Sequence, residues 1–121
     1  MSTLTERIGA NSELPFEVRK VFINAGVPEG WTAAWTNLWR ECVARAVMDA
    51  LGYTGQTEPD KHTAIQWEAE RWFRYSKDLQ EVFELADLPL KTTRDAVLAN
   101  LPLTRKTTGG IKGTKRIRKQ K

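Results

Sequence analysis

The residues best suited to chemistry in this chain are the lysines and arginines that gather at its C-terminal end. Residues 105–121 contain eight of them and no acidic residue. They are Arg105, Lys106, Lys112, Lys115, Arg116, Arg118, Lys119 and Lys121. A dense run of cations binds the phosphate backbone of nucleic acids by releasing counterions, with steep salt dependence and little sequence preference. The tail therefore predicts contact with nucleic acid, and an acidic protein surface is the main rival partner.

The rest of the chain carries the opposite charge. The sequence has 19 basic and 15 acidic residues, so residues 1–104 hold 19 − 8 = 11 basic and all 15 acidic residues, a net charge of −4. An acidic domain is a poor sole ligand for DNA at physiological salt. The charge division thus favours either a nucleic-acid protein that depends on its tail or a body that binds another protein.

A second group of candidate contact residues lies in the stretch LQEVFELADLPLKTTRDAVLANL, residues 79–101. We interpret segment 77–101 as two short helices joined at a bend, like a helix-turn-helix. In that arrangement the second helix offers its N-terminal residues to the major groove. Lys and Arg suit phosphate or guanine, and Thr suits phosphate or a thymine methyl group. The candidate contacts on this helix are Lys91, Thr92, Thr93 and Arg94.

Three features of the segment leave open whether it contacts DNA or only closes a core. Asp87 or Leu88 stands where such a bend usually has glycine, and the acidic Asp95 lies on the second helix. The first helix also carries acidic residues that would repel DNA if they faced it, namely Asp78, Glu81 and Glu84.

Catalytic and metal-binding patterns are not evident. His62 and Cys42 are the only residues of their types, and they form neither a nucleophile pair nor a zinc-binding set. The glycines of TTGGIKGTK lack the preceding strand and following helix of a phosphate-binding loop. We therefore expect no enzyme activity, no metal and no cofactor, and a surface or capping role for His62.

Apolar residues recur with the 3.6-residue period of amphipathic helices, and no segment alternates with a period of two. Thr3 to Ile8 could form one helical turn, and longer helices are predicted over about 13–25, 31–51, 60–75, 77–88 and 92–100. Ser12, Asp60, Ser76 and Thr92 are placed to cap them, Thr92 in a capping box with Asp95. We expect an all-α domain over residues 1–103, a compact bundle of about five helices. The tail, residues 104–121, should be disordered when free.

Five Trp residues are many for a chain of this length. Trp31, Trp35 and Trp39 follow one another every four residues on the longest predicted helix. They could stack on single-stranded bases, but their apolar neighbours Leu38 and Cys42 favour burial. We therefore expect a Trp-rich core, with Trp31 partly exposed at the start of the helix.

The region 35–100 resembles small α-helical proteins of bacteriophage and prophage genomes, which share the pattern A…W…S-x-D…V-x-x-L-A-x-L. The matching residues are Ala69, Trp72, Ser76, Asp78, Val82, Leu85, Ala86 and Leu88. Those proteins often have LAGLDP at the bend, where this chain has LADLPL. The resemblance implies a phage-encoded accessory protein that regulates transcription or handles DNA, and it implies no catalytic residues.

Three functions follow. The first is a phage-type regulatory protein that docks on DNA through segment 77–101 while the tail contacts the backbone. The second is an interaction factor that binds host RNA polymerase or a phage packaging or regulatory partner, its tail touching nucleic acid in that assembly. The third is an RNA-binding tail, and DNA is favoured over RNA. The single cysteine, and the lack of a signal peptide or membrane span, favour a reducing cytoplasm, and the resemblance implies that of a bacterial host cell.

Overall fold

The computed structural model describes residues 3–102, and all regular structure within them is α-helical. The helices are α1 (Leu4–Ala10), α2 (Phe16–Ala25), α3 (Ala33–Ala50), α4 (Pro59–Tyr75), α5 (Leu79–Ala86) and α6 (Leu90–Ala99). The all-α expectation is confirmed for this part of the chain. The predictions for the tail, residues 104–121, lie outside the described residues.

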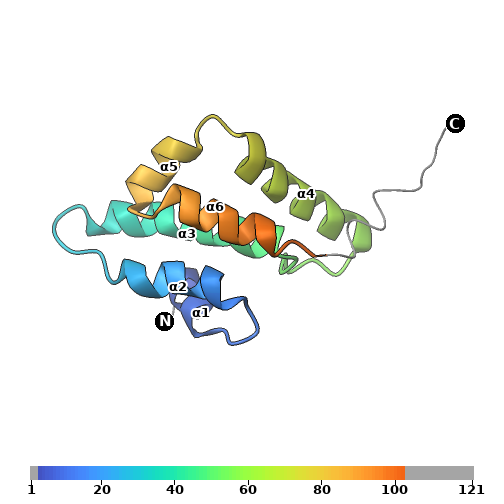
Figure 1. Cartoon of the computed structure of the whole chain (residues 1–121), viewed down its shortest axis with the longest axis horizontal. Helices are drawn as coiled ribbons and strands as arrows, with labels where there is room; N and C mark the ends of the chain where they lie inside the picture. The colour runs from blue at the N-terminus through green and yellow to red at the C-terminus, as the bar shows by residue number, and fades with distance from the viewer. Residues whose placement is uncertain (1–2, 103–121) are drawn as a thin grey trace, which may run out of the picture.

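Helix α3 runs along the long axis of the molecule (Figure 1). Helices α1 and α2 lie on one side of it and α4 and α5 on the other, while α6 lies between α2 and α4 and packs against both. One cluster of buried apolar side chains includes residues from all six helices. None of these helices is both long enough and apolar enough to cross a membrane.

The first helix is longer than the single turn that the sequence predicted, and two sets of hydrogen bonds explain it. Thr3 and Glu6 form a capping box, with the Thr3 hydroxyl accepting from the Glu6 amide and the Glu6 carboxylate accepting from the Thr3 amide. Glu41 of α3 then accepts from the amides of Leu4 and Thr5 at 2.8 and 2.9 Å. Six helices are therefore described where about five were expected.

The predicted caps of the later helices are wrong, although the helices themselves are present. Helix α2 begins after Pro15 and α4 after Glu58, so Ser12 and Asp60 do not cap them. Ser76 ends α4, and its hydroxyl accepts from the Asp78 amide at 3.1 Å. Each predicted start was displaced by one to three residues because apolar periodicity marks the buried face of a helix better than its first residue.

The buried aromatic residues of the core are phenylalanines, with Trp39 and Trp72 partly buried against it, and the expectation of a Trp-rich core is not confirmed. Phe22, Phe73 and Phe83 are buried, whereas none of the five Trp residues is. Trp31 is 92% exposed, as its position at the helix start indicated, and Trp35 is 64% exposed, which contradicts its predicted burial. The face of α3 that packs inward is the neighbouring one, which contains Val43, Val47 and Ala50.

Candidate nucleic-acid interface

A short bend joins α5 to α6 in the segment that the sequence predicted to be like a helix-turn-helix. Only Asp87, Leu88 and Pro89 separate the two helices. Asp87 is left-handed, with φ 56° and ψ 52°, and within residues 3–102 it is the one non-glycine residue with positive φ. A short polar side chain tolerates this region better than most. Asp87 thus takes the conformation for which a turn glycine is usually chosen.

The bend also ends α5 with a recognisable cap. The amide of Leu88 donates to the carbonyl of Phe83 at 3.0 Å, and the amide of Asp87 donates to the carbonyl of Glu84 at 3.1 Å. This combination, with a left-handed residue followed by a buried apolar one, is a Schellman-type C-cap. The direction in which α6 leaves α5 is therefore set by hydrogen bonds and by the burial of Leu88.

Arg40 of α3 caps the C-terminal ends of two helices at once. Its Nε donates to the carbonyl of Ala86 and its Nη1 to that of Gly26, both at 2.7 Å. Its Nη2 lies 3.4 Å from the carbonyls of Ala25 and Asp87. The side chain is 2% exposed, and a cation at a helix C-terminus interacts favourably with the helix dipole. Arg40 thereby links the end of α2 to the bend.

The sequence prediction missed Arg40, although a signal was present. Arg40 precedes Val43 by three residues and Val47 by seven, so it lies on the inward face of α3. A charged residue at a core position is rare unless its charge is paired or hydrogen-bonded. That exception to the apolar pattern could have marked it as a residue with buried polar partners.

The structure brings three of the four predicted contact residues of α6 toward solvent. Lys91 and Thr92 are exposed and Arg94 is half-buried. Thr93 is a correction, because its side chain is 1% exposed and its hydroxyl donates to the carbonyl of Pro89 at 2.6 Å. Thr93 stabilises the start of the helix and is removed from the proposed contact set.

The predicted capping box of Thr92 and Asp95 is also wrong, because α6 begins two residues earlier, at Leu90. Asp95 instead accepts from the Lys91 ammonium group at 2.7 Å, one helical turn away. This hydrogen bond, together with the positive charge of Lys91, lowers the pKa of Asp95. The first turn of α6 has no side-chain cap, so its amides remain available to a ligand.

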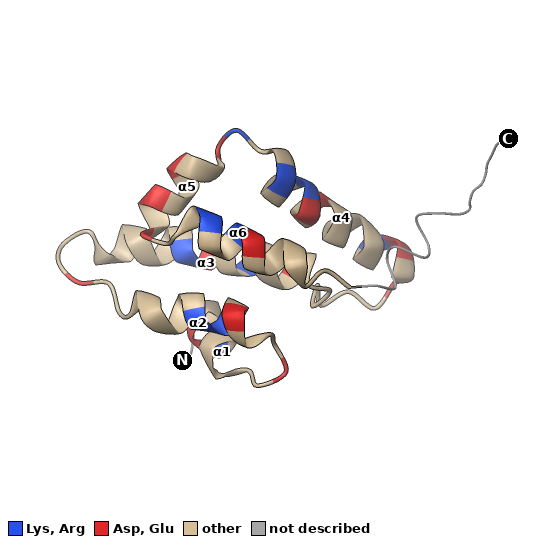
Figure 2. Cartoon of the chain, viewed as in Figure 1, with Lys and Arg blue, Asp and Glu red and all other residues tan. Residues whose placement is uncertain are grey.

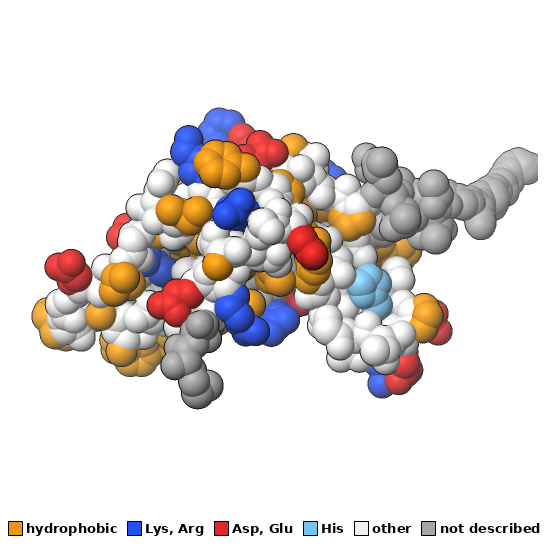
Figure 3. Space-filling view, turned by 90° about the horizontal axis from the view of Figure 1, so that it is seen from below, with side chains coloured by type: hydrophobic (Ala, Val, Ile, Leu, Met, Phe, Trp, Pro, Cys, Tyr) orange, Lys and Arg blue, Asp and Glu red, His pale blue; other side chains and the backbone are white. Residues whose placement is uncertain are grey.

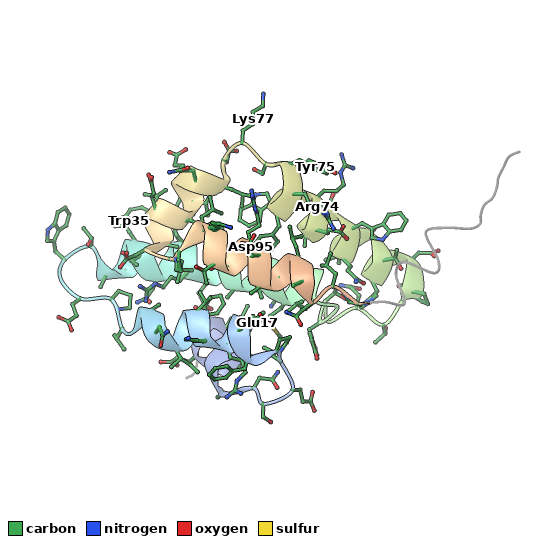
Figure 4. The ribbon with its side chains drawn as sticks, in the orientation of Figure 1. Glu17, Trp35, Arg74, Tyr75, Lys77 and Asp95 are labelled. Carbon is green, nitrogen blue, oxygen red and sulfur yellow. The ribbon has the colours of Figure 1, made fainter. Side chains whose placement is uncertain are left out.

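The surface around the start of α6 has mixed charge. A groove of about 590 Å³ separates α2 from the bend and the first turn of α6. Its charged lining residues are Glu17, Lys20 and Asp87, and Thr92 forms part of its α6 side. Glu17 also accepts from the side chain of Asn100 at 2.7 Å, which joins α2 to the end of α6. Figure 2 shows acidic residues along α5, and Figure 4 shows Asp95 on α6 above Glu17 of α2.

The eight predicted tail contacts, from Arg105 to Lys121, lie outside the described residues. The described chain stops at Pro102, directly after α6. Helix α6 has ten residues and is therefore about 15 Å long. The last described residue thus follows the end of α6 that is opposite to Lys91 and Thr92.

No metal-binding group of His, Cys, Asp or Glu occurs within residues 3–102. His62 is half-buried, and its Nδ1 lies 2.8 Å from the hydroxyl of Thr54. This contact joins the loop after α3 to the first turns of α4. Cys42 is exposed on α3 as a free thiol.

Comparison of the chain with protein-family models, with curated proteins and with solved structures finds no match. The resemblance to phage and prophage proteins stays a prediction.

Proposed function

We propose that this protein is a phage-type regulatory protein that binds nucleic acid, docking on DNA through α5 and α6 while residues 105–121 contact the phosphate backbone. The observation that carries the proposal is the bend, in which a three-residue connection with a left-handed Asp87 is followed by an uncapped helix start. Exposed Lys91 and Thr92 lie on that first turn, and half-buried Arg94 follows at the start of the second.

The two contact regions have different tasks in this proposal. The start of α6 supplies free amides and short polar side chains, which can approach a phosphate or a base edge. It supplies little net attraction, because Asp95 neutralises Lys91 and Glu17 and Asp87 lie nearby. The tail supplies the attraction, and its attachment to the end of α6 raises the local concentration of the helix at the DNA.

Salt-dependent binding tests the contribution of the tail. Affinity for duplex DNA, single-stranded DNA and RNA is measured at two salt concentrations, for the natural chain and for a variant with the eight tail cations replaced by Gln. The slope of log affinity against log salt should decrease in magnitude by up to about 7, because each neutralised phosphate contributes ~0.9. Unchanged affinity and slope would refute the role of the tail. The ranking of the three ligands decides between DNA and RNA.

A second experiment tests the role of α6. Lys91→Ala and Arg94→Ala should reduce discrimination between DNA sequences, while Lys61→Ala is a matched control. Lys61 is an exposed lysine in the first turn of α4 and pairs with Glu58 at 3.3 Å. If the control changes discrimination as much as the α6 variants do, α6 does not contact the bases.

The acidic body supports one alternative, in which the protein binds host RNA polymerase or a phage packaging or regulatory partner. All 15 acidic residues of the chain lie within the described region, where they outnumber the basic residues by four. Like-charge repulsion opposes an approach of this surface to DNA. Binding of the Gln-substituted chain to purified bacterial RNA polymerase, together with loss of DNA binding, would favour this alternative.

A further inference from the structure

The outward face of α3 carries apolar side chains that no described helix covers. Trp31, Trp35, Leu38 and Cys42 follow one another at spacings of four, three and four residues, and we call these four residues the Trp stripe. Trp35 and Leu38 are 64% and 52% exposed, and Cys42 is exposed as well. Trp31 lies in the turn directly before α3. Alternating steps of four and three are the spacing of a helix that packs along its length against another helix.

The stripe begins where the α2–α3 loop joins α3, at one end of the molecule (Figure 1). Figure 3 shows hydrophobic side chains gathered at the end of the molecule formed by the α2–α3 loop and the start of α3. Figure 4 shows Trp35 at this end, well away from Asp95 on α6. A contiguous cluster of exposed apolar side chains commonly marks an interaction surface.

Further along the same face of α3, the Trp stripe is followed by a groove. The groove lies between α3 and α4 and has a volume of about 390 Å³. Its walls are Cys42, Arg45, Ala46 and Asp49 from α3, and Ile65, Glu68, Ala69 and Trp72 from α4. Cys42 belongs to both features, so the stripe leads directly into the groove. One helix face therefore offers large apolar side chains in its first half and a partly apolar hollow in its second.

The groove contains a carboxylate, that of Asp49, with one oxygen that accepts no hydrogen bond. Asp49 Oδ1 is buried without a hydrogen bond, and its nearest cationic atom is Arg45 Nη1 at 3.9 Å. Burial raises the pKa of Asp49, and the charge of Arg45 opposes that rise. The Arg45 side chain is itself largely exposed. An aromatic ring with an N–H donor fits this pair, because its face attracts a guanidinium and its N–H can donate to a carboxylate.

We propose that two copies of this chain pair through α3, antiparallel and about a two-fold axis at Leu38. In that register the paired residue numbers sum to 76, so Trp31 of one copy meets Arg45 of the other. Trp35 meets the region of Cys42, and the Trp stripe of each copy enters the groove of the other copy. The indole of Trp31 then covers the Arg45 guanidinium and lies one helical turn from Asp49.

The second copy is the occupant that the chemistry favours. A two-fold interface must be self-complementary, and this face carries both the indole ridge and the groove that accepts an indole, in the order that the symmetry requires. Arg45 is the only cation on the stripe and the groove, which makes the face a poor platform for nucleic-acid bases. The pairing does not depend on the nucleic-acid proposal and is tested without nucleic acid.

The first test is the mass of the full chain in solution, by sedimentation equilibrium over a range of concentrations. The natural chain should approach twice its 13.8 kDa. Trp35→Lys and, separately, Trp31→Lys should each weaken the dimer by at least about tenfold, because buried Trp residues dominate such interfaces. Trp31 precedes the helix and is almost fully exposed, so its substitution tests the interface even if Trp35→Lys unfolds the chain.

Trp67→Lys is the matched control. Trp67 is an exposed Trp of α4 that lines neither the groove nor the stripe, so this variant should remain a dimer. A natural chain that stays at 13.8 kDa at every concentration would overturn the proposal. So would a dimer that tolerates both stripe substitutions, since another surface or another partner would then be involved.

Cross-linking tests the register. In a Cys42→Ser background, Leu38→Cys places two thiols at the two-fold axis, and mild oxidation should produce a disulfide-linked dimer. Ala34→Cys in the same background is the control, because Ala34 is an exposed residue of α3 outside the stripe. Cross-linking at position 34 that equals or exceeds that at position 38 would exclude an axis at Leu38.

Discussion

The strongest prediction for stability concerns Arg40, which should be tested with Arg40→Met. Methionine retains most of the apolar stem but removes every donor that caps α2 and α5. Two of the bonds are short, 2.7 Å to the carbonyls of Gly26 and Ala86, and hydrogen bonds to charged groups contribute about 1.5–3 kcal/mol each. The gross loss is therefore about 3–6 kcal/mol. Burying a methionine in place of a guanidinium recovers part of it, since a buried charge has a desolvation cost.

We expect a net loss of about 3 kcal/mol in the free energy of unfolding, which is a large share of the ~5–15 kcal/mol of an ordinary domain. Urea denaturation followed by far-UV circular dichroism measures it. With a slope of ~1–3 kcal/mol per M, the midpoint should fall by about 1–3 M.

Two further variants make the result interpretable. Arg40→Lys keeps the charge but cannot reach both helix ends with a single ammonium group, so its stability should lie between those of the natural chain and Arg40→Met. Arg71→Met removes an exposed arginine of α4 and should change stability by less than about 0.5 kcal/mol. If Arg40→Met were as stable as Arg71→Met, the carbonyls would have other partners and the reasoning would be refuted.

Three other substitutions give smaller, specific changes. Asp87→Val should lower stability, because a β-branched residue is strained in the left-handed backbone and because the carboxylate 3.6 Å from Arg40 Nη2 is lost, and urea denaturation measures the change. The pKa of Glu41 is below its ordinary value of 4.5, because its hydrogen bonds from α1 outweigh the effect of burial. This carboxylate therefore stabilises the fold above pH 4.5 and loses that effect as the pH falls through its folded pKa, so the stability difference between the natural chain and Glu41→Gln should disappear in acid. Thr93→Val should cost about 1 kcal/mol through loss of the bond to Pro89 and leave DNA affinity unchanged, which titration of the folded variant checks.

The long helices could be predicted from the sequence because their apolar period is strong, and the burial of Val18 and Phe22 on α2 follows it directly. Their first residues could not, since tertiary contacts decide them. Glu41 caps α1 from 36 residues away in the sequence, and no local pattern reports such a partner. Periodicity also cannot choose between adjacent apolar faces of one helix, and the face that is buried contains Val43 rather than Trp35.

The candidate site was predictable in outline for a similar reason. Residue types identify Lys91, Thr92 and Arg94 as suitable contacts, but only the start of α6 at Leu90 shows that Thr93 faces inward. Asp87 illustrates the converse case. It stands where such a bend usually has glycine, yet the cap hydrogen bonds and the burial of Leu88 hold it in the left-handed backbone, which a short polar residue tolerates. Local preference gave way to packing at both positions.

Arg40 connects the two proposed surfaces. The carbonyls of Ala25 and Gly26 that it caps precede the loop that carries Trp31, and those of Ala86 and Asp87 precede α6. Releasing the guanidinium therefore frees the chain on both sides, whereas a change in the Trp stripe or at the start of α6 acts on one surface alone. Arg40→Lys, if folded, should weaken both self-association and DNA binding. Trp31→Lys should weaken self-association, measured without DNA, and leave DNA binding unchanged. Arg94→Ala should weaken DNA binding and leave self-association unchanged. This asymmetry separates a shared structural anchor from two local contacts, because no single contact residue can produce the double effect.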